Sequence, residues 1–87
     1  MQIEIFEADG YGLSTDTDVL LINLKKKYAS DLLVKKINIS DKEQVRKHKD
    51  VVKELSEKGL DILPVIKLDG KIVNEEKLEQ ALSRKLG

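Results

Sequence analysis

The segment ILPVIKLDGKIV, at 62–73, constrains the fold of this chain more than any other stretch. Its Asp-Gly pair is flanked by apolar runs, and such a pair is a strong short-range signal for a two-residue hairpin turn. We therefore predict two antiparallel strands that meet at Asp69 and Gly70. Pro64, the only proline, is predicted to be the first residue of the hairpin, where it need not donate a ladder hydrogen bond.

Two further strands are predicted upstream of this hairpin. The residues QIEIF, at 2–6, alternate between apolar and polar side chains, as a half-buried strand does. The residues LLVKKINI, at 32–39, are rich in β-branched side chains and form the second strand. The length of 87 residues suits one small domain, so we assign 1–87 to a single domain.

Three helices are predicted in the remaining segments. Ser14 or Thr15 can cap the first, because their hydroxyl oxygens accept hydrogen bonds from the free amides of a helix start. Asp41 or Ser40 begins the second, and Gly59 is the residue after its end. The third helix covers the last residues of the chain, with an apolar face on one side.

The resulting order is β-α-β-α-β-β-α. The helix between the first two strands is a crossover, which implies that these strands are parallel, whereas the terminal hairpin is antiparallel. We therefore predict an α/β fold with a mixed four-stranded sheet and helices on both faces. This order resembles that of the thioredoxin fold. The resemblance implies that a cis peptide bond precedes Pro64 and that this proline lies against the loop after the first strand.

The composition excludes several kinds of chemistry. The chain has no cysteine, so disulfides, thiol–disulfide exchange, iron–sulfur ligation and cysteine-type zinc sites are ruled out. Sixteen basic residues balance 16 acidic ones, which argues against nucleic-acid binding. No apolar run reaches the roughly 20 residues of a membrane helix, and the first residues do not resemble a signal peptide. We therefore expect a cytoplasmic protein without membrane insertion.

The loop FEADGYGLSTDTD, at 6–18, has the form of an active-site loop but contains no cysteine, histidine or lysine. Gly10 and Gly12 permit backbone angles that other residues resist. Asp16 and Asp18 match the positive end of the following helix. Capping explains these carboxylates better than a cation site, because the spacing of an EF-hand loop is absent. No cofactor and no metal are expected.

Nearly the whole chain resembles the ArsD family of arsenical-resistance metallochaperones and repressors. The resemblance rests on the stretches IFEADG…LST, KKINIS and VVKELSEKGLDILPVIKLDGKIV. Members of that family bind trivalent arsenic or antimony through three cysteine thiolates around the Ser-Thr pair. Gly12, Leu13 and Asp18 occupy those positions here, and none of them can bind a soft metalloid. The resemblance implies a partner, a P-loop ATPase of the arsenite-pump type or a related metal-trafficking component, but not arsenic delivery.

Two functions are compatible with such a loop. The first is a non-catalytic binding module that docks a partner protein through residues 10–15 and Pro64, by surface contact or by strand addition. The alternative is a regulatory protein that binds a small anion at the glycine loop and helix start. A structural remnant that acts only as a dimer is a third possibility. The residues expected to contact a partner are Tyr11, Gly12, Ser14, Thr15 and Pro64.

The remaining features are two individual side chains and two basic stretches. Tyr11, between two glycines, either folds back over Pro64 or anchors a partner. His48, the only histidine, has no evident nucleophile to pair with, so we expect no catalysis and place its ring at the edge of the buried stripe of the second helix. The basic stretches at 25–27 and 35–36 are predicted to be solvated surface.

Overall fold

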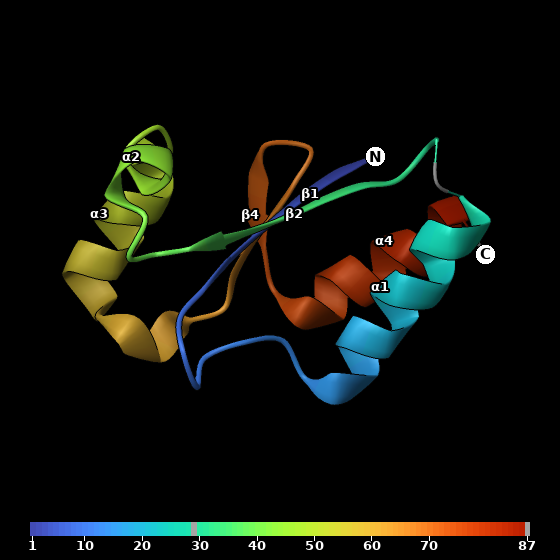
Figure 1. The fold of residues 1–87 in the computed structure, drawn as a ribbon, viewed down its shortest axis with the longest axis horizontal. Coiled ribbons are helices and arrows are strands. Elements are labelled where there is room, and N and C mark those ends of the chain that lie inside the picture. Colours follow the sequence, from blue (N-terminus) through green and yellow to red (C-terminus); the bar gives the residue numbers. More distant parts are fainter. Residues whose placement is uncertain (29, 87) are drawn as a thin grey trace.

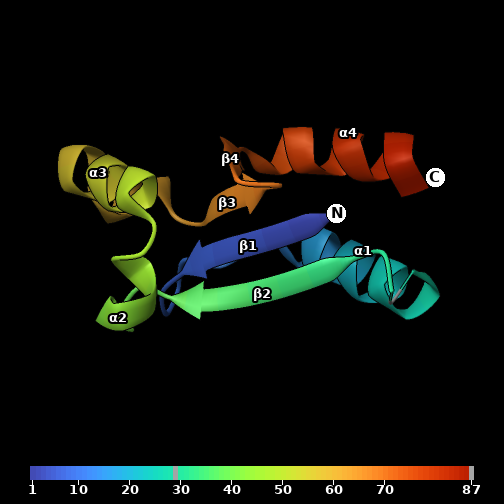
Figure 2. The same cartoon turned by 90° about the horizontal axis from the view of Figure 1, so that it is seen from above.

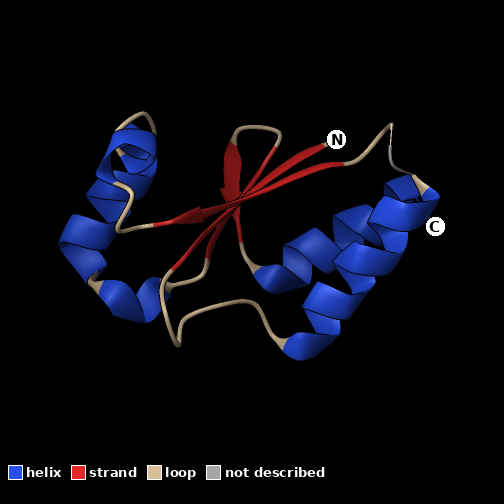
Figure 3. Cartoon of the chain, in the orientation of Figure 1, coloured by secondary structure: helices blue, strands red, loops and turns tan. Residues whose placement is uncertain are grey.

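A computed structural model describes residues 1–28 and 30–86, and it shows a sheet that separates two groups of helices (Figure 1; strands red in Figure 3). The sheet has four strands in the order β2-β1-β3-β4. β1 runs parallel to β2 and antiparallel to β3, and β3 is antiparallel to β4. The predicted mixed four-stranded sheet is therefore confirmed. The strands are β1 (Gln2–Glu7), β2 (Leu33–Asn38), β3 (Val65–Leu68) and β4 (Lys71–Val73).

Helices cover both faces of this sheet, as predicted. The pair α1 and α4 lies on one side and the pair α2 and α3 on the other (Figure 1). A short 3₁₀ helix, η1, leads from α3 to β3. The helices are α1 (Thr15–Lys27), α2 (Lys42–Val45), α3 (Lys49–Lys58), η1 (Leu60–Ile62) and α4 (Glu75–Leu86). No helix within 1–28 and 30–86 is long and apolar enough to cross a membrane.

The alternation of side chains along β1 divides the interior into two cores. Ile3 and Ile5 point toward α1 and α4, while Phe6 points toward α2 and α3, and all three are fully buried. The core on the α1 and α4 side contains Ile3, Ile5, Leu21, Leu32, Ile66, Leu78 and Leu82. The core on the α2 and α3 side contains Phe6, Ile37, Val45, Val51, Leu63 and Val65.

The prediction of one continuous second helix was wrong. Asp41 caps α2, its side chain accepting a hydrogen bond from the Gln44 amide at 3.4 Å, but α2 ends at Val45 and α3 starts afresh after His48. Val45 and Val51 both enter the same core. At about 3.6 residues per turn, residues six apart lie on different sides of one helix. The break is therefore what allows both valines to be buried together.

The predicted hairpin turn is confirmed. Asp69 and Gly70 have φ angles of 49° and 86°, and positive φ at both central residues is the type I′ geometry that suits an Asp-Gly pair. The Asp69 amide also donates to the Gln2 carbonyl at 2.8 Å, which ties the turn to β1. Pro64 lies one residue before β3 rather than at its first position, and the Leu63–Pro64 peptide bond is cis.

Ile5→Ala should lower the free energy of unfolding by about 2–5 kcal/mol, because it leaves a cavity at a fully buried position. Ile22→Ala makes the same chemical change on α1 where the side chain is 54% exposed, and should change stability by no more than about 0.5 kcal/mol. Urea unfolding monitored by circular dichroism measures both. If the Ile5→Ala chain does not fold, Ile5→Val should cost about 0.5–1.5 kcal/mol. Equal losses for the two isoleucines would contradict this description of the core.

Candidate functional site

One end of the sheet gathers the loop at 8–14, the start of α1, Pro64 and the start of α4. Phe6 pairs with Val65, so the end of β1 lies beside the start of β3. A hydrogen bond from the Ser14 amide to Glu75 then joins the start of α1 to that of α4. These segments come from three separate parts of the chain, because the loop continues directly into α1.

The loop is a tight turn that holds Tyr11 at the surface. The Tyr11 amide donates to the Ala8 carbonyl at 2.9 Å, and Gly10 has a φ of 82°, a value that favours glycine. Tyr11 remains 39% exposed. Gly12 lies close to the Glu7 carboxylate, since a Cβ added at Gly12 would stand 3.3 Å from the Glu7 Oε2. The loop thus presents an aromatic side chain beside an acidic one.

Ser14 is the N-cap of α1. Its Oγ accepts a hydrogen bond from the Thr17 amide at 3.4 Å, and its own amide donates to the Glu75 Oε1 at 2.9 Å. In a capping box, a Glu or Gln of the same helix accepts this second bond. Here a glutamate of α4 supplies it. The Thr17 hydroxyl, which is buried, also donates to the Glu79 Oε1 at 3.0 Å, so α1 and α4 are joined twice at this end.

The predicted site residues are only partly brought together. Tyr11, Gly12 and Ser14 lie in the loop, Thr15 is the first residue of α1, and all four residues are exposed. Pro64 is half-buried at the same end of the sheet, but it borders a separate groove of about 180 Å³ between α3, η1 and the β3–β4 hairpin. Tyr11 does not line that groove. The loop and the proline are therefore two neighbouring surfaces rather than one cleft.

Acidic side chains dominate this end of the molecule. Asp18 is paired with Lys36 at 2.9 Å, and no lysine or arginine precedes residue 25 in the chain. No group of three or more His, Cys, Asp or Glu side chains within the described residues could hold a metal ion. The negative charge is therefore a property of a surface, not of a chelating site. The acidic residues at this end are Glu7, Asp9, Asp16, Asp18, Glu75 and Glu79.

The sequence analysis missed a polar cluster on the α3 side of the sheet. Lys67 is only 8% exposed, and its Nζ lies 3.2 Å from the Asp50 carboxylate and 3.3 Å from the His48 Nδ1. The His48 Nε2 lies 3.3 Å from the Glu4 carboxylate. Because an ammonium group only donates, the His48 Nδ1 is the acceptor in its hydrogen bond with Lys67, while Nε2 faces the Glu4 carboxylate.

This cluster also corrects the prediction for His48. The residue is the N-cap of α3 without a side-chain capping bond, and its ring meets Phe6 edge-on at 4.8 Å between ring centroids. A signal for the cluster was present in the sequence, since Glu4 and Lys67 are charged residues that each stand between two apolar residues of a strand. The two residues are direct neighbours across the β1–β3 pair.

The Asp50 carboxylate is held in its charged form. Burial raises the pKa of the Asp50 carboxyl. The hydrogen bonds from Lys67 and from the Val51 amide together lower it by a larger amount, so the pKa lies below its ordinary value of 3.8. Every buried side-chain nitrogen and oxygen in the described residues has a hydrogen-bond partner. The cluster therefore has the features of a fully hydrogen-bonded structural network on this face of the sheet.

Comparisons with protein families and with curated proteins found no match. The resemblance to the ArsD family therefore stays a hypothesis.

Glu75→Ala should destabilise the protein by about 0.5–1 kcal/mol, because the Ser14 amide loses its acceptor at the start of α1. Glu75→Gln keeps an acceptor oxygen and should therefore lose less stability than Glu75→Ala. Glu76→Ala, an exposed neighbour on α4, is the matched control. Urea denaturation gives all three values. A loss for Glu76→Ala as large as that for Glu75→Ala would show that helix propensity, not the bond to Ser14, is responsible.

Asp50→Asn should reduce stability at neutral pH by about 0.2–1 kcal/mol, since the carboxylate is half-exposed. The pKa of Asp50 is lower in the folded state, so its contribution is fully present above about pH 4 and disappears as the pH falls through the folded pKa. The gap between wild type and variant should therefore close on acidification. Urea midpoints from neutral pH downward measure it, with the exposed Asp61→Asn as control. A gap that stays constant would contradict the assignment.

Proposed function

We propose that the protein is a non-catalytic, thioredoxin-like binding module that docks a partner protein through residues 10–15 and the neighbouring Pro64. The observation that carries this proposal is the exposed loop from Tyr11 to Thr15, held in a fixed conformation at the start of α1. A rigid exposed aromatic side chain is a common anchor in protein interfaces, because it loses little conformational freedom on binding.

The topology supports the thioredoxin-like assignment. A parallel β1–α1–β2 unit is followed by an antiparallel β3–β4 hairpin and a final helix that packs beside α1. The cis bond before Pro64 lies where the chain enters β3, at the end of the sheet that carries the loop. These are the features that the resemblance implied.

The absence of catalysis in this proposal follows from where the polar groups lie. The Ser14 hydroxyl serves as the cap of α1 and contacts the Thr17 hydroxyl at 2.9 Å. The only histidine lies on the other face of the sheet, bonded to Glu4 and Lys67. A nucleophile needs a base within hydrogen-bonding reach. Within the described residues, Ser14 and His48 form no such pair.

The charge of the site indicates the chemistry of the partner. Glu7 and Asp9 precede Tyr11 in the sequence, and Asp16 follows in the first turn of α1. A complementary surface would carry lysine or arginine residues around a recess for the tyrosine ring. By resemblance to the ArsD family, this partner is a P-loop ATPase of the arsenite-pump type or another metal-trafficking component.

Small-anion binding is the weaker candidate function. The Ser14 amide already donates to Glu75, and the Thr17 amide to Ser14. An added phosphate would have to displace the Glu75 carboxylate from an acidic surface, where the neighbouring cation Lys36 is already paired with Asp18. A binding anion would raise the melting temperature in proportion to the logarithm of its concentration.

Immobilised protein should retain a partner from a lysate of its native source, and Tyr11→Ala should reduce retention at least about tenfold, since aromatic anchors often contribute 2 kcal/mol or more. Val52→Ala, which truncates another exposed apolar side chain on α3, is the matched control and should bind as wild type does. The purified partner should then bind more weakly as salt concentration rises.

Equal retention by Tyr11→Ala and wild type would contradict docking through the loop. A rise in melting temperature with millimolar phosphate, lost in Ser14→Ala, would favour the anion-binding alternative instead.

A further inference from the structure

We propose a second docking surface, independent of the loop at 10–15: the free edge of β2 and the adjoining groove bind an extended acidic segment of a partner protein. This segment would add to the sheet as a strand. Its apolar side chains would lie beside Leu33 and Val34, and its carboxylates beside Lys35 and Lys36. The proposal rests on the unpaired strand edge, on the lining of the groove and on the distribution of charge.

β2 is an outer strand of the sheet, with β1 on one side and no strand on the other (Figure 2). The amides of Leu33 and Ile39 donate inward, to carbonyls at the two ends of β1, both at 2.9 Å. Backbone groups of successive strand residues point to alternate sides. Val34 and Lys36 therefore direct their amides and carbonyls away from β1, toward the open edge, whereas the Asn38 carbonyl accepts a hydrogen bond from the Asp41 amide at 2.9 Å.

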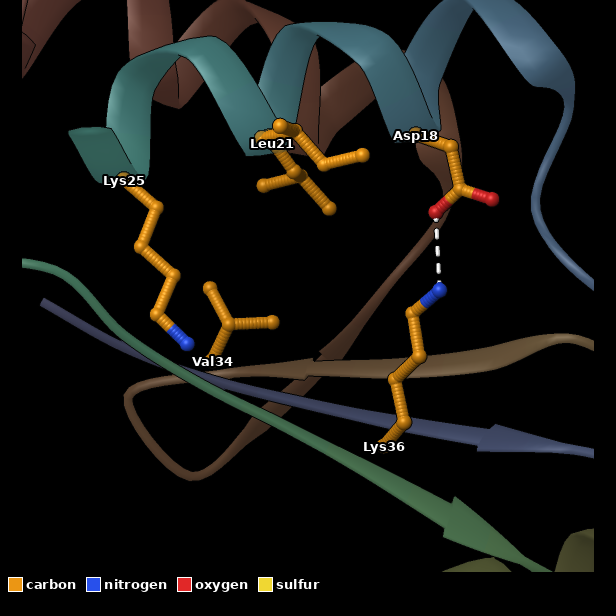
Figure 4. A pocket seen from close by; sticks show the side chains of 6 residues that line it. Asp18, Leu21, Lys25, Val34 and Lys36 are labelled. Carbon is orange, nitrogen blue, oxygen red and sulfur yellow. Dashed lines mark hydrogen bonds and ion pairs between the residues drawn. The ribbon is translucent and has the colours of Figure 1, made fainter.

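A groove of about 190 Å³ runs along this edge, between β2 and α1 (Figure 4). Leu21 and Val34 form its apolar part, and Ile22 on its border is 54% exposed. Lys25 extends from α1 toward β2 at one end, while Lys36 pairs with Asp18 at the other (Figure 4). The side chains of Val34 and Lys36 thus face the groove while their backbone groups face the edge.

The charge of this surface favours an acidic ligand. Lys25 forms no ion pair or hydrogen bond with any residue described in the structure, so its ammonium group is available to a ligand. Lys35 and Lys36 are exposed in the middle of the strand, and Leu33 before them is 64% exposed. Among the described residues that line the groove, Asp18 is the one acidic side chain, and it is paired with Lys36, so a ligand carboxylate at Lys36 would share that ammonium group with Asp18. Opposite charges on directly neighbouring strands attract and like charges repel. A strand with apolar residues and two adjacent carboxylates complements this edge.

The same lysines argue against a second copy of this chain as the occupant. If two β2 strands paired antiparallel about Lys35 or about Lys36, that lysine of one copy would face the same lysine of the other. Lysines at an edge strand are a known protection against such self-association. An acidic segment would place carboxylates beside these lysines, so the interaction would be attractive. The charge of the edge therefore favours an acidic segment over a second copy of this chain.

The first probe is the fluorescein-labelled peptide Thr-Val-Glu-Glu-Val-Thr, whose symmetric pattern suits either strand direction, with Thr-Val-Lys-Lys-Val-Thr as its charge-reversed control. Fluorescence anisotropy at low ionic strength should show saturable binding of the glutamate peptide only. Lys36→Glu should weaken binding at least tenfold. Lys71→Glu, on the opposite edge strand, should change it less than twofold, and Tyr11→Ala should leave it unchanged.

Backbone pairing is tested separately at the same position. Lys36→Ala removes the charge, and Lys36→Pro also removes an amide that points away from β1 and so is not needed for the sheet. The proline variant should bind at least threefold more weakly than the alanine variant, while circular dichroism shows that both are folded. In the wild type, the amides of Val34 and Lys36 should exchange with deuterium more slowly once the peptide is bound.

Several results would overturn the proposal. One is the absence of saturable binding to folded wild type. Another is an equal loss for Lys71→Glu and Lys36→Glu, which would indicate attraction by charge alone. Equal binding by the alanine and proline variants would exclude strand addition. A dimer in sedimentation experiments that Lys36→Pro dissociates would assign the edge to a second copy instead.

Discussion

The burial of β1 on both faces is the constraint on which the rest of this structure depends. Ile5 and Phe6 are adjacent in sequence, are both fully buried and point into different cores. A strand of this kind requires helices on each side, because either core left open would expose a large apolar surface to water. The parallel crossover through α1 supplies one cover, and the segment between β2 and β3 supplies the other. Every surface discussed here is therefore positioned relative to β1.

The hydrogen bonds between α1 and α4 determine how the loop after β1 is presented. Ser14 and Glu75 are 61 residues apart, yet their bond fixes the start of α1 against the start of α4. This bond and the one from Thr17 to Glu79 together hold the end of the loop that enters α1. A binding loop held by both of its flanking elements needs little reorganisation when a partner arrives, which preserves affinity. In the proposed docking mode, binding at this end would thus rely on residues that do not themselves contact the partner.

Local signals made much of the fold predictable from sequence. The Asp69-Gly70 turn, the alternation along β1 and the cap at Ser14 each depend on neighbouring residues only. Interactions between distant segments could not be read in this way. The break before α3 reflects what the core can accommodate, and the bond to Glu75 and the contacts of Lys67 depend on how the strands and helices pack. For the same reason Tyr11 was correctly expected in the loop, but its separation from the groove at Pro64 was not foreseen.

The arrangement of charge along α1 has a consequence for how the whole molecule meets its surroundings. Asp16 and Asp18 occupy the first turn, and three lysines occupy the last. The chain has no net charge, so the field of a distant charged partner neither attracts nor repels it as a whole. The separated charges nevertheless form an electric dipole, on which such a field exerts a torque. Electrostatics would then govern the angle at which this protein approaches a partner more than the frequency with which it arrives.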